Sequence, residues 1–226
     1  MIAMSGEANP LIADLGLELN LGFSEGLPCR LYSGKVNDKE VYVCINGKML
    51  GYDLVGCEAA VLATERAISF VDPDIVISYG TCGAFAKKGA SIGDVYLSKP
   101  IVMFHDRRVP GDPTGIQSVG NYPSLDTSFI AKALGLKQGK ITTGSSLGMS
   151  EEDKRIIEEE GGECKDMEAA AVAFVCLLHR MPFFAVKAVT DFVDSPADTF
   201  DAFKENFELA TRNLLVETKR IIEYFE

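Results

Sequence analysis

Two apolar runs constrain the fold of this chain more than any other feature of its sequence. DIVISYG (residues 74–80) and PFFAVKAVTD (residues 182–191) are nearly continuous in apolar residues, as expected for strands covered on both faces of a sheet. Around them, helical patterns alternate with shorter strand-like runs. The sequence therefore predicts an α/β domain with a central, largely buried mixed β-sheet flanked by helices.

The rest of the chain supplies the other elements of this domain. Helices are expected over residues 5–16, 52–70, 124–136, 150–162, 166–180 and 198–226. Strands are expected over residues 1–4 (very short), 28–36, 40–46, 92–104 and 139–146. Ser5 and Ser150 are candidate N-caps. Loops are expected over residues 80–91 and over the Pro- and Gly-rich residues 108–124. No break in composition divides the chain, which predicts a single domain over residues 1–226.

The charge of the chain bears on its partners. The formal net charge is −11, and a surface this acidic repels phosphate backbones and anionic lipids. The sequence contains no apolar run of about 18 residues, the length that suggests a membrane-spanning helix, and no signal-peptide pattern. We therefore expect neither a nucleic acid nor a membrane as partner.

Cysteine usage indicates a compartment. The chain has 6 cysteines and none of them forms a C-x-x-C pair. Four lie within apolar or small-residue stretches, so we expect them to be reduced and mostly buried, which suits a cytoplasmic protein. The two histidines, His105 and His179, form no cluster with cysteines, so no metal site is expected.

Three carboxylates lie near junctions between predicted elements. Glu7 follows the first short strand, Glu168 lies in the first turn of a helix that Asp166 can cap, and Asp191 ends a buried strand. Each has an ordinary structural explanation. A helix dipole stabilises a first-turn carboxylate by roughly 0.3–1 kcal/mol, and Asp191 can cap a turn. In open α/β sheets, however, ligands collect at the carboxyl ends of strands, so the three residues could share one site.

The GTCG segment at residues 80–83 is a weaker signal. The chain has neither a G-x-G-x-x-G motif after a strand nor a P-loop. GTCG follows a buried strand, so it is either a tight turn or a loop whose N–H groups and Thr81 hydroxyl face a polar ligand. The residues alone leave both explanations open.

Together, these segments resemble a known family. IAMSGEANPL, VDPDIVISYGTCGAFAKKGASIGDVYLS, FHDRRVP, TTGSSLGMS, KDMEAAAVAF and FFAVKAVTDFVD are similar to the 5′-methylthioadenosine/S-adenosylhomocysteine nucleosidases, especially the plant-type methylthioadenosine nucleosidases. The similarity runs over almost the whole chain. It implies the nucleoside phosphorylase-like fold of the nucleoside phosphorylase and nucleosidase superfamily. It also implies a hydrolase of methionine salvage that cleaves 5′-methylthioadenosine to adenine and 5-methylthioribose, with S-adenosylhomocysteine left open as a second substrate.

The resemblance implies a role for each of the three carboxylates. Asp191 matches the acid that protonates N7 of adenine and so makes the base a neutral leaving group. Glu7 matches the residue that activates water for attack on an oxocarbenium-like ribose. Glu168 matches the carboxylate that holds the ribose hydroxyls, and we expect the helix dipole to keep it partly ionised. This chemistry needs no metal or organic cofactor.

Other positions match residues that contact substrate or support the water site. The implied substrate-binding residues are Leu50, Thr81, Gly83, Leu147, Met167 and Thr190. Asp166 and Lys187 match the polar pair behind the water site in its plant-type form. Ser145 and Gly148 depart from plant-type relatives, which tend to carry Asp there, so the shape of this part of the pocket stays open.

The nucleophile is the sharpest choice that the resemblance leaves. Phosphorylases of this superfamily hold phosphate with arginines, one near the first helix and one three residues before the Ser/Thr of the glycine loop. The second position here is Ser78, and residues 5–13 contain no arginine, which favours water because a phosphate dianion would lack forked donors. Arg107 and Arg108 are still candidates for reaching a site. A nucleoside phosphorylase that depends on phosphate is therefore the alternative enzyme.

Two further expectations follow from the resemblance. A storage or binding protein on the same fold would be expected to lose Glu7 or Asp191, and both are present. The family also implies a homodimer in which residues 104–124 lie near the site of the neighbouring subunit.

Overall fold

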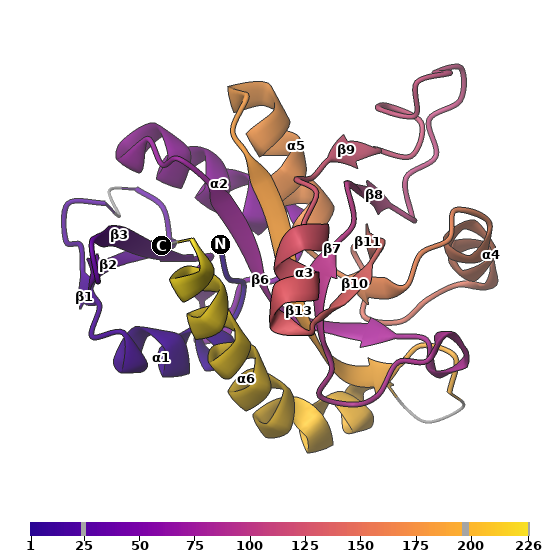
Figure 1. Ribbon diagram of the computed structural model, residues 1–226. Helices are drawn as coiled ribbons and strands as arrows, with labels where there is room; N and C mark the ends of the chain where they lie inside the picture. Colours follow the sequence, from indigo (N-terminus) through magenta and orange to yellow (C-terminus); the bar gives the residue numbers. More distant parts are fainter. Residues whose placement is uncertain (24–25, 196–198, 226) are drawn as a thin grey trace.

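The computed structural model describes residues 1–23, 26–195 and 199–225. Its helices are α1 (Ser5–Asp14), α2 (Cys57–Val71), α3 (Ser128–Leu134), α4 (Glu151–Glu159), α5 (Ala169–His179) and α6 (Thr199–Tyr224), with a 3₁₀ helix η1 (Ala86–Lys88). Its strands are β1 (Glu18–Leu19), β2 (Arg30–Val36), β3 (Lys39–Ile45), β4 (Lys48–Met49), β5 (Tyr52–Asp53), β6 (Val76–Ala84), β7 (Val95–Ser98), β8 (Ile101–Phe104), β9 (Tyr122–Pro123), β10 (Lys137–Gly139), β11 (Ile141–Thr143), β12 (Cys164–Asp166) and β13 (Phe183–Phe192) (Figure 1). No helix in these ranges is both long and apolar enough to cross a membrane.

A mixed sheet of eight strands forms the centre of the fold. Its strand order is β10-β7-β13-β6-β12-β11-β8-β9. β6 and β13 lie side by side and parallel in the middle, while β13 pairs antiparallel with β7 and β6 pairs antiparallel with β12. The two apolar runs of the sequence supply this central pair. The prediction of a single α/β domain with a buried mixed sheet is confirmed.

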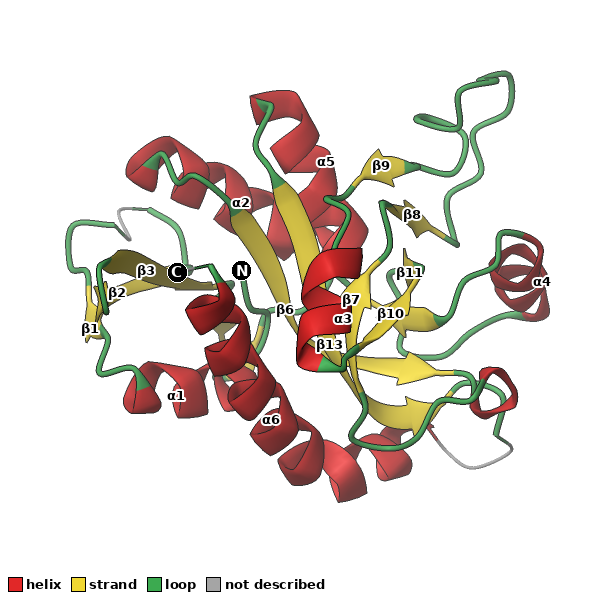
Figure 2. Ribbon diagram, in the orientation of Figure 1, coloured by secondary structure: helices red, strands yellow, loops and turns green. Residues whose placement is uncertain are grey.

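Helices cover both faces of the sheet, which gives three layers (Figure 2). Helices α1, α3 and α6 pack on one side, and α2 and α5 pack on the other. Strand β13 contributes side chains to the hydrophobic core on each face of the sheet, because successive side chains of a strand point to opposite faces. Phe184, Val186 and Ala188 join the core on the α6 side. Phe183, Ala185 and Val189 join the core on the α5 side.

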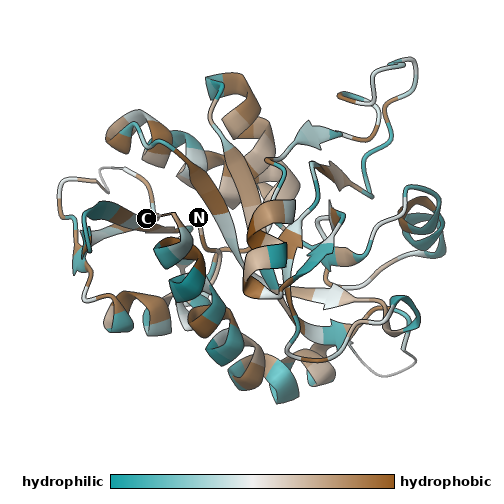
Figure 3. Ribbon diagram, viewed as in Figure 1, coloured by the Kyte–Doolittle hydropathy of each residue, from teal (hydrophilic) through white to brown (hydrophobic). Residues whose placement is uncertain are grey.

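Helix α5 is apolar on all sides, unlike α6, which shows hydrophilic residues along its outer surface (Figure 3). The first residues of α5, Ala169 to Ala171, are at most 1 % exposed. Alanine side chains are short, so the helix can pack closely between α2 and the sheet. This close packing fixes the start of α5, and with it the position of Glu168.

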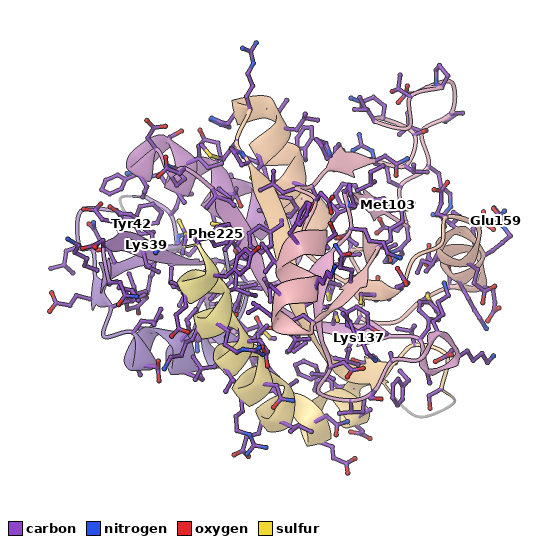
Figure 4. All side chains as sticks on the ribbon, in the orientation of Figure 1. Lys39, Tyr42, Met103, Lys137, Glu159 and Phe225 are labelled. Carbon is purple, nitrogen blue, oxygen red and sulfur yellow. The ribbon has the colours of Figure 1, made fainter. Side chains whose placement is uncertain are left out.

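A smaller sheet in the order β1-β2-β3 lies beside the central one. Lys39 and Tyr42 mark it on the opposite side of the molecule from Glu159 of α4 (Figure 4). The first strand expected from the sequence is reduced to Ile2, which bridges β3 and β6 in parallel fashion. Helix α1 begins three residues later, so this bridge delivers Glu7 to the centre of the main sheet.

The GTCG segment is a strand, and the prediction of a loop at this point is wrong. β6 continues through these residues to Ala84 because both of its neighbours extend alongside it. β13 pairs with it past a bulge between Val189 and Asp191, and β12 pairs with its last residues. Glycine content alone suggested a turn, but non-local pairing keeps the segment extended.

Other predictions of element boundaries are also wrong. The helix expected over residues 52–70 begins at Cys57, because Gly56 has φ of 97° and breaks the chain direction there. Ser5 is the first residue of α1 rather than its N-cap, and its hydroxyl donates to Asp53 Oδ1 at 2.6 Å. The N-cap predicted at Ser150 is confirmed. The short strands β1, β4, β5, β9, β10 and β12 were not predicted. Because Asp166 pairs in β12, the helix expected over residues 166–180 begins only at Ala169.

Candidate active site

Glu7 lies in the first turn of α1 with its carboxylate buried against β6. Oε1 accepts hydrogen bonds from the N–H and the hydroxyl of Thr81, at 2.7 and 2.8 Å. Gly80 permits this approach, because a Cβ there would lie only 3.0 Å from Oε1. Burial raises the pKa of Glu7, while the charge of Lys187 is the main effect that opposes the rise. The structure thus brings Glu7 and Thr81 together.

Asp191 lies near the end of β13, against the end of β6. Its Oδ1 accepts a hydrogen bond from the Thr190 hydroxyl at 2.8 Å. A Cβ at Gly83 would lie 2.7 Å from Oδ2, so glycine is required where the carboxyl group crosses β6. Burial raises the pKa of Asp191, against the Thr190 hydrogen bond and the charge of Lys165. A carboxyl group that retains its proton is suited to act as an acid.

Glu168 is the N-cap of α5 and so precedes the first turn in which it was expected. Its Oε1 accepts a hydrogen bond from the N–H of Gly56 at 2.8 Å. Burial raises the pKa of Glu168 to about 7, although the charge of Lys187 opposes this. Desolvation therefore outweighs the helix dipole, and the carboxyl group is only partly ionised near neutral pH.

Asp166 and Lys187 form a buried ion pair behind these groups. Lys187 Nζ lies 2.8 Å from Asp166 Oδ2. The same carboxylate accepts hydrogen bonds from the Thr143 hydroxyl and from the N–H of Ala169, the first residue of α5. Asp166 itself lies in β12, and the N-cap residue is Glu168 rather than Asp166 as predicted. Burial disfavours the ammonium, yet the charges of Asp166 and Glu168 raise the pKa of Lys187 above its ordinary value. Lys187 is therefore a fixed cation.

An open cavity of about 350 Å³ lies beside the end of β13. Its lining residues are Leu147, Met149, Ser150, Glu151, Lys154, Val193, Asp194, Ser195 and Thr199. Leu147, which the sequence assigned to the wall of a base pocket, belongs to the loop between β11 and α4. The cavity has the volume of a small-molecule site and begins two residues beyond Asp191.

Two other predicted binding residues, Met167 and Leu50, differ in their exposure. Met167 is partly buried, and its carbonyl accepts a hydrogen bond from the Cys57 thiol at 3.4 Å. Leu50 is 91 % exposed at the turn between β4 and β5. The N–H and hydroxyl of Ser5 both donate to Asp53, which ties this hairpin to α1. The hairpin is thus fixed to the helix that bears Glu7, while Leu50 itself projects into solvent.

Comparisons with known proteins show the family of this chain. Residues 1–223 match the sequence profile of the phosphorylase superfamily. The 5′-methylthioadenosine nucleosidase of Arabidopsis thaliana is 40 % identical to this chain, over 99 % of the chain and 85 % of the relative. This chain is a member of the methylthioadenosine/S-adenosylhomocysteine nucleosidase family.

Other members of the nucleosidase family have the same fold. The structure of the Arabidopsis thaliana 5′-methylthioadenosine nucleosidase in apo form has a TM-score of 0.94, covering 99 % of this chain and 93 % of the other. The 5′-methylthioadenosine/S-adenosylhomocysteine nucleosidase of the same plant is 36 % identical, over 99 % of this chain and 89 % of the relative. The predictions of family and of fold are confirmed.

This nucleosidase family shares its superfamily with phosphorylases, so the placement of arginines matters. Ser78, at the position where a phosphate-binding arginine was sought, is buried within β6. Arg107 donates to the Tyr122 hydroxyl and to Gln117, and Arg108 donates to Asp153 on α4. Both arginines that the sequence left as candidates are therefore already paired in the structure.

Several contributors to the nucleosidase site were not predicted. The N–H of Gly56 holds Glu168, the Thr143 hydroxyl holds Asp166, and the Asn206 amide donates to the Thr190 carbonyl at 2.9 Å. Lys165 donates to two carbonyls of the loop that carries Leu147. Gly56 and Asn206 are far from the site in sequence, but Thr143 and Lys165 lie inside motifs already quoted and could have been singled out.

Proposed function

We propose that this chain is a hydrolytic nucleosidase that cleaves the N-glycosidic bond of 5′-methylthioadenosine to adenine and 5-methylthioribose. One observation carries the proposal: Glu7 and Asp191, both buried, contact β6 at Thr81 and Gly83. Positions two residues apart lie about 7 Å apart along a strand. Two carboxyl groups held at separate positions along one strand can act on opposite sides of a sugar ring, one on the leaving group and one on water.

Asp191 is the acid of the proposed reaction. Adenine leaves poorly as an anion, and protonation at N7 makes it a neutral leaving group. The buried site that raises the pKa of Asp191 favours the protonated carboxyl group that this step requires. The cavity that begins beside Asp191, with Leu147 in its wall, would hold the base.

Glu7 and its neighbours serve the opposite side of the ribose. Ionised Glu7 would orient a water molecule and accept its proton as the water attacks the anomeric carbon. The charge of Lys187 favours this ionised form, since it lowers the pKa of Glu7 against the effect of burial. Ionised Glu168 would accept hydrogen bonds from the ribose hydroxyls and stabilise the cationic transition state.

Hydrolysis is favoured over phosphorolysis by the absence of free arginines among the described residues near the site. Ser78 offers no charge, and Arg107 and Arg108 are engaged elsewhere. The space behind Glu168 and Lys187 is a cavity of about 10 Å³, which has room for about one water molecule. The names of the relatives also support a nucleosidase.

The test is turnover of 5′-methylthioadenosine in phosphate-free buffer, with adenine followed by its absorbance and the sugar product identified by mass. We expect adenine and 5-methylthioribose at the same rate whether or not phosphate is added. A reaction that requires phosphate and yields a sugar 1-phosphate would overturn the proposal in favour of a nucleoside phosphorylase. The same assay with S-adenosylhomocysteine would define the substrate range.

We propose in addition that the chain acts in methionine salvage, in the cytoplasm and as a homodimer. Six free cysteines suit a reducing compartment. Apolar side chains are exposed on the β4–β5 hairpin, at Met49, Leu50 and Tyr52, and on the loop between β8 and β9, at Val109 and Ile116. That loop projects away from the body of the molecule (Figure 1). Exposed apolar groups near a site are typical of a surface that a partner subunit covers.

A further inference from the structure

Lys165 is a buried lysine whose partners are neutral. It lies in the middle of β12 and is 5 % exposed. Its ammonium donates to the carbonyl of Ser146 at 2.7 Å and to the carbonyl of Leu147 at 2.9 Å. Burying an ammonium group is costly, and two neutral carbonyls offset that cost less well than a carboxylate does. A hydrophobic residue would be the simpler way to fill this position.

Successive side chains of β12 point to opposite faces of the strand, so Lys165 does not lie on the face where the attacking water is proposed to bind. Asp166 follows it and points to Lys187, so Lys165 points to the opposite face of the strand. In the sheet, Lys165 is paired with Gly83, the residue that Asp191 crosses. Lys165 therefore lies between the acid and the loop of Leu147.

The same loop is held at a second point. The N–H of Ser145 donates to Asp106 Oδ2 at 2.7 Å, and the buried His105 ring packs so closely on Gly144 that no Cβ would fit there. Together with the bonds from Lys165, these contacts fix both N–H and C=O groups of the loop backbone. A loop that is held in this way can present a constant set of backbone groups to a flat ligand.

We propose that Lys165 is a positioning residue of the nucleosidase, which fixes the Ser146–Leu147 segment against the edge of the purine and places a positive charge beside Asp191. The inference rests on the function proposed above, since it assigns the base to the pocket that contains Leu147. Lys165 does not touch the reacting atoms. It acts through the loop and through the acid.

The charge of Lys165 has a consequence for the acid. It lowers the pKa of Asp191 against the larger effect of burial. Removing this charge therefore raises the pKa of Asp191 further, and the acid stays protonated to higher pH. The acidic groups whose charges act on Lys165 are Asp166, Asp191, Asp153 and Asp106. The charge of Lys165 also lowers the pKa of His105, which follows β8.

The experiment compares Lys165→Met, Lys165→Arg and the wild-type chain. Lys140→Met is the matched control, because Lys140 is also partly buried and donates to a backbone carbonyl, that of Glu160, away from the site. Each protein is measured for adenine affinity by calorimetry, for KM and kcat with 5′-methylthioadenosine, and for the pH at which kcat falls on the alkaline side. Thermal unfolding shows whether each variant folds.

We expect Lys165→Met to weaken adenine binding and raise KM by about tenfold, because two backbone carbonyls of the loop lose their donor and the loop is no longer fixed. Its alkaline limb moves to higher pH. Lys165→Arg restores much of both properties, and the control changes neither. If Lys165→Met does not fold, Lys165→Gln, which keeps a donor without the charge, is expected to shift the alkaline limb in the same direction.

Two results would overturn the inference. In one, the neutral variants bind adenine like the wild type. In the other, kcat falls while KM and the alkaline limb are unchanged, which is the mark of a purely structural role. Either result with an active wild type leaves the proposed function intact. A wild-type chain that neither binds adenine nor cleaves the nucleoside removes the proposed function and this inference together.

Discussion

Burial sets the protonation of the carboxyl groups at the site. Glu7, Glu168 and Asp191 all have a raised pKa, and desolvation is the largest cause in each case. Lys187 opposes the rise at Glu7 and Glu168, while Lys165 opposes it at Asp191. The pKa of Glu7 and of Glu168 is thus lowered by Lys187, whereas the pKa of Asp191 is lowered by Lys165.

Asp191→Asn tests the acid directly. We expect kcat for 5′-methylthioadenosine to fall about a hundred- to ten-thousand-fold, because an amide cannot protonate N7. The fold should persist, since asparagine can still accept the Thr190 hydrogen bond. Asp126→Asn is the control: Asp126 is exposed, does not line the cavity and accepts a hydrogen bond from the N–H of Ser128. Adenine release at near wild-type rates by the first variant would remove Asp191 from the mechanism.

Glu168→Gln tests the pKa of about 7 for Glu168 through the pH dependence of the free energy of unfolding. The folded chain binds this proton more tightly than the unfolded one, so Glu168 contributes stability that is complete below its ordinary pKa of 4.5 and is lost as pH rises through about 7. Glutamine does not titrate. Urea unfolding should therefore show the variant gaining stability relative to the wild type between pH 4.5 and 7, then levelling. A difference that is constant with pH would contradict the shift.

The sequence located the candidate carboxylates because each lies at an end of a helix or strand that a local pattern reveals. Lys165 lies inside a motif that the sequence analysis quoted, but its role could not be predicted, because the bond from Lys165 to Ser146 depends on how β12 lies beside the loop. It also did not reveal the state of Glu168, because a helix dipole is visible in sequence but burial is not. Which acid is desolvated is decided by packing between distant segments.

At the level of elements, β6 shows how non-local pairing overrides composition. Its GTCG segment has the glycine content of a turn, yet it is extended between β12 and β13. The two glycines are required for another reason, since Gly80 and Gly83 make room for Glu7 and Asp191. The sequence predicted the central strands and the amphipathic α6 well, because their periodicity is local. It missed β10 and β12, which have three residues each.

The close packing of α5 predicts a stability effect. Ala171 is 1 % exposed between α2 and the sheet. Ala171→Leu adds volume where there is no space, and we expect a loss of about 1–3 kcal/mol in the free energy of unfolding. Ala13→Leu, the same change at an exposed position of α1, should alter it by less than about 0.5 kcal/mol. Equal effects in urea unfolding would mean that α5 has room to adjust.

At the level of the whole molecule, the exposed apolar residues near the site predict a dimer. We expect size-exclusion chromatography with light scattering to give twice the chain mass. The double variant Val109→Asp with Ile116→Asp should shift this toward monomer and reduce activity, because both residues lie on the projecting loop. Leu21→Asp changes an exposed leucine between β1 and β2 of the smaller sheet. It should neither shift the mass toward monomer nor reduce activity. A fully active wild-type monomer would contradict the proposed dimer.

The central claim is that water, activated at Glu7, replaces adenine on the sugar. The most direct measurement is single-turnover cleavage of 5′-methylthioadenosine in water labelled with heavy oxygen, in the presence of phosphate, with the sugar product analysed immediately by mass spectrometry. The account predicts 5-methylthioribose that carries one heavy oxygen, at a rate that Glu7→Gln strongly reduces. A sugar 1-phosphate without the label would contradict it.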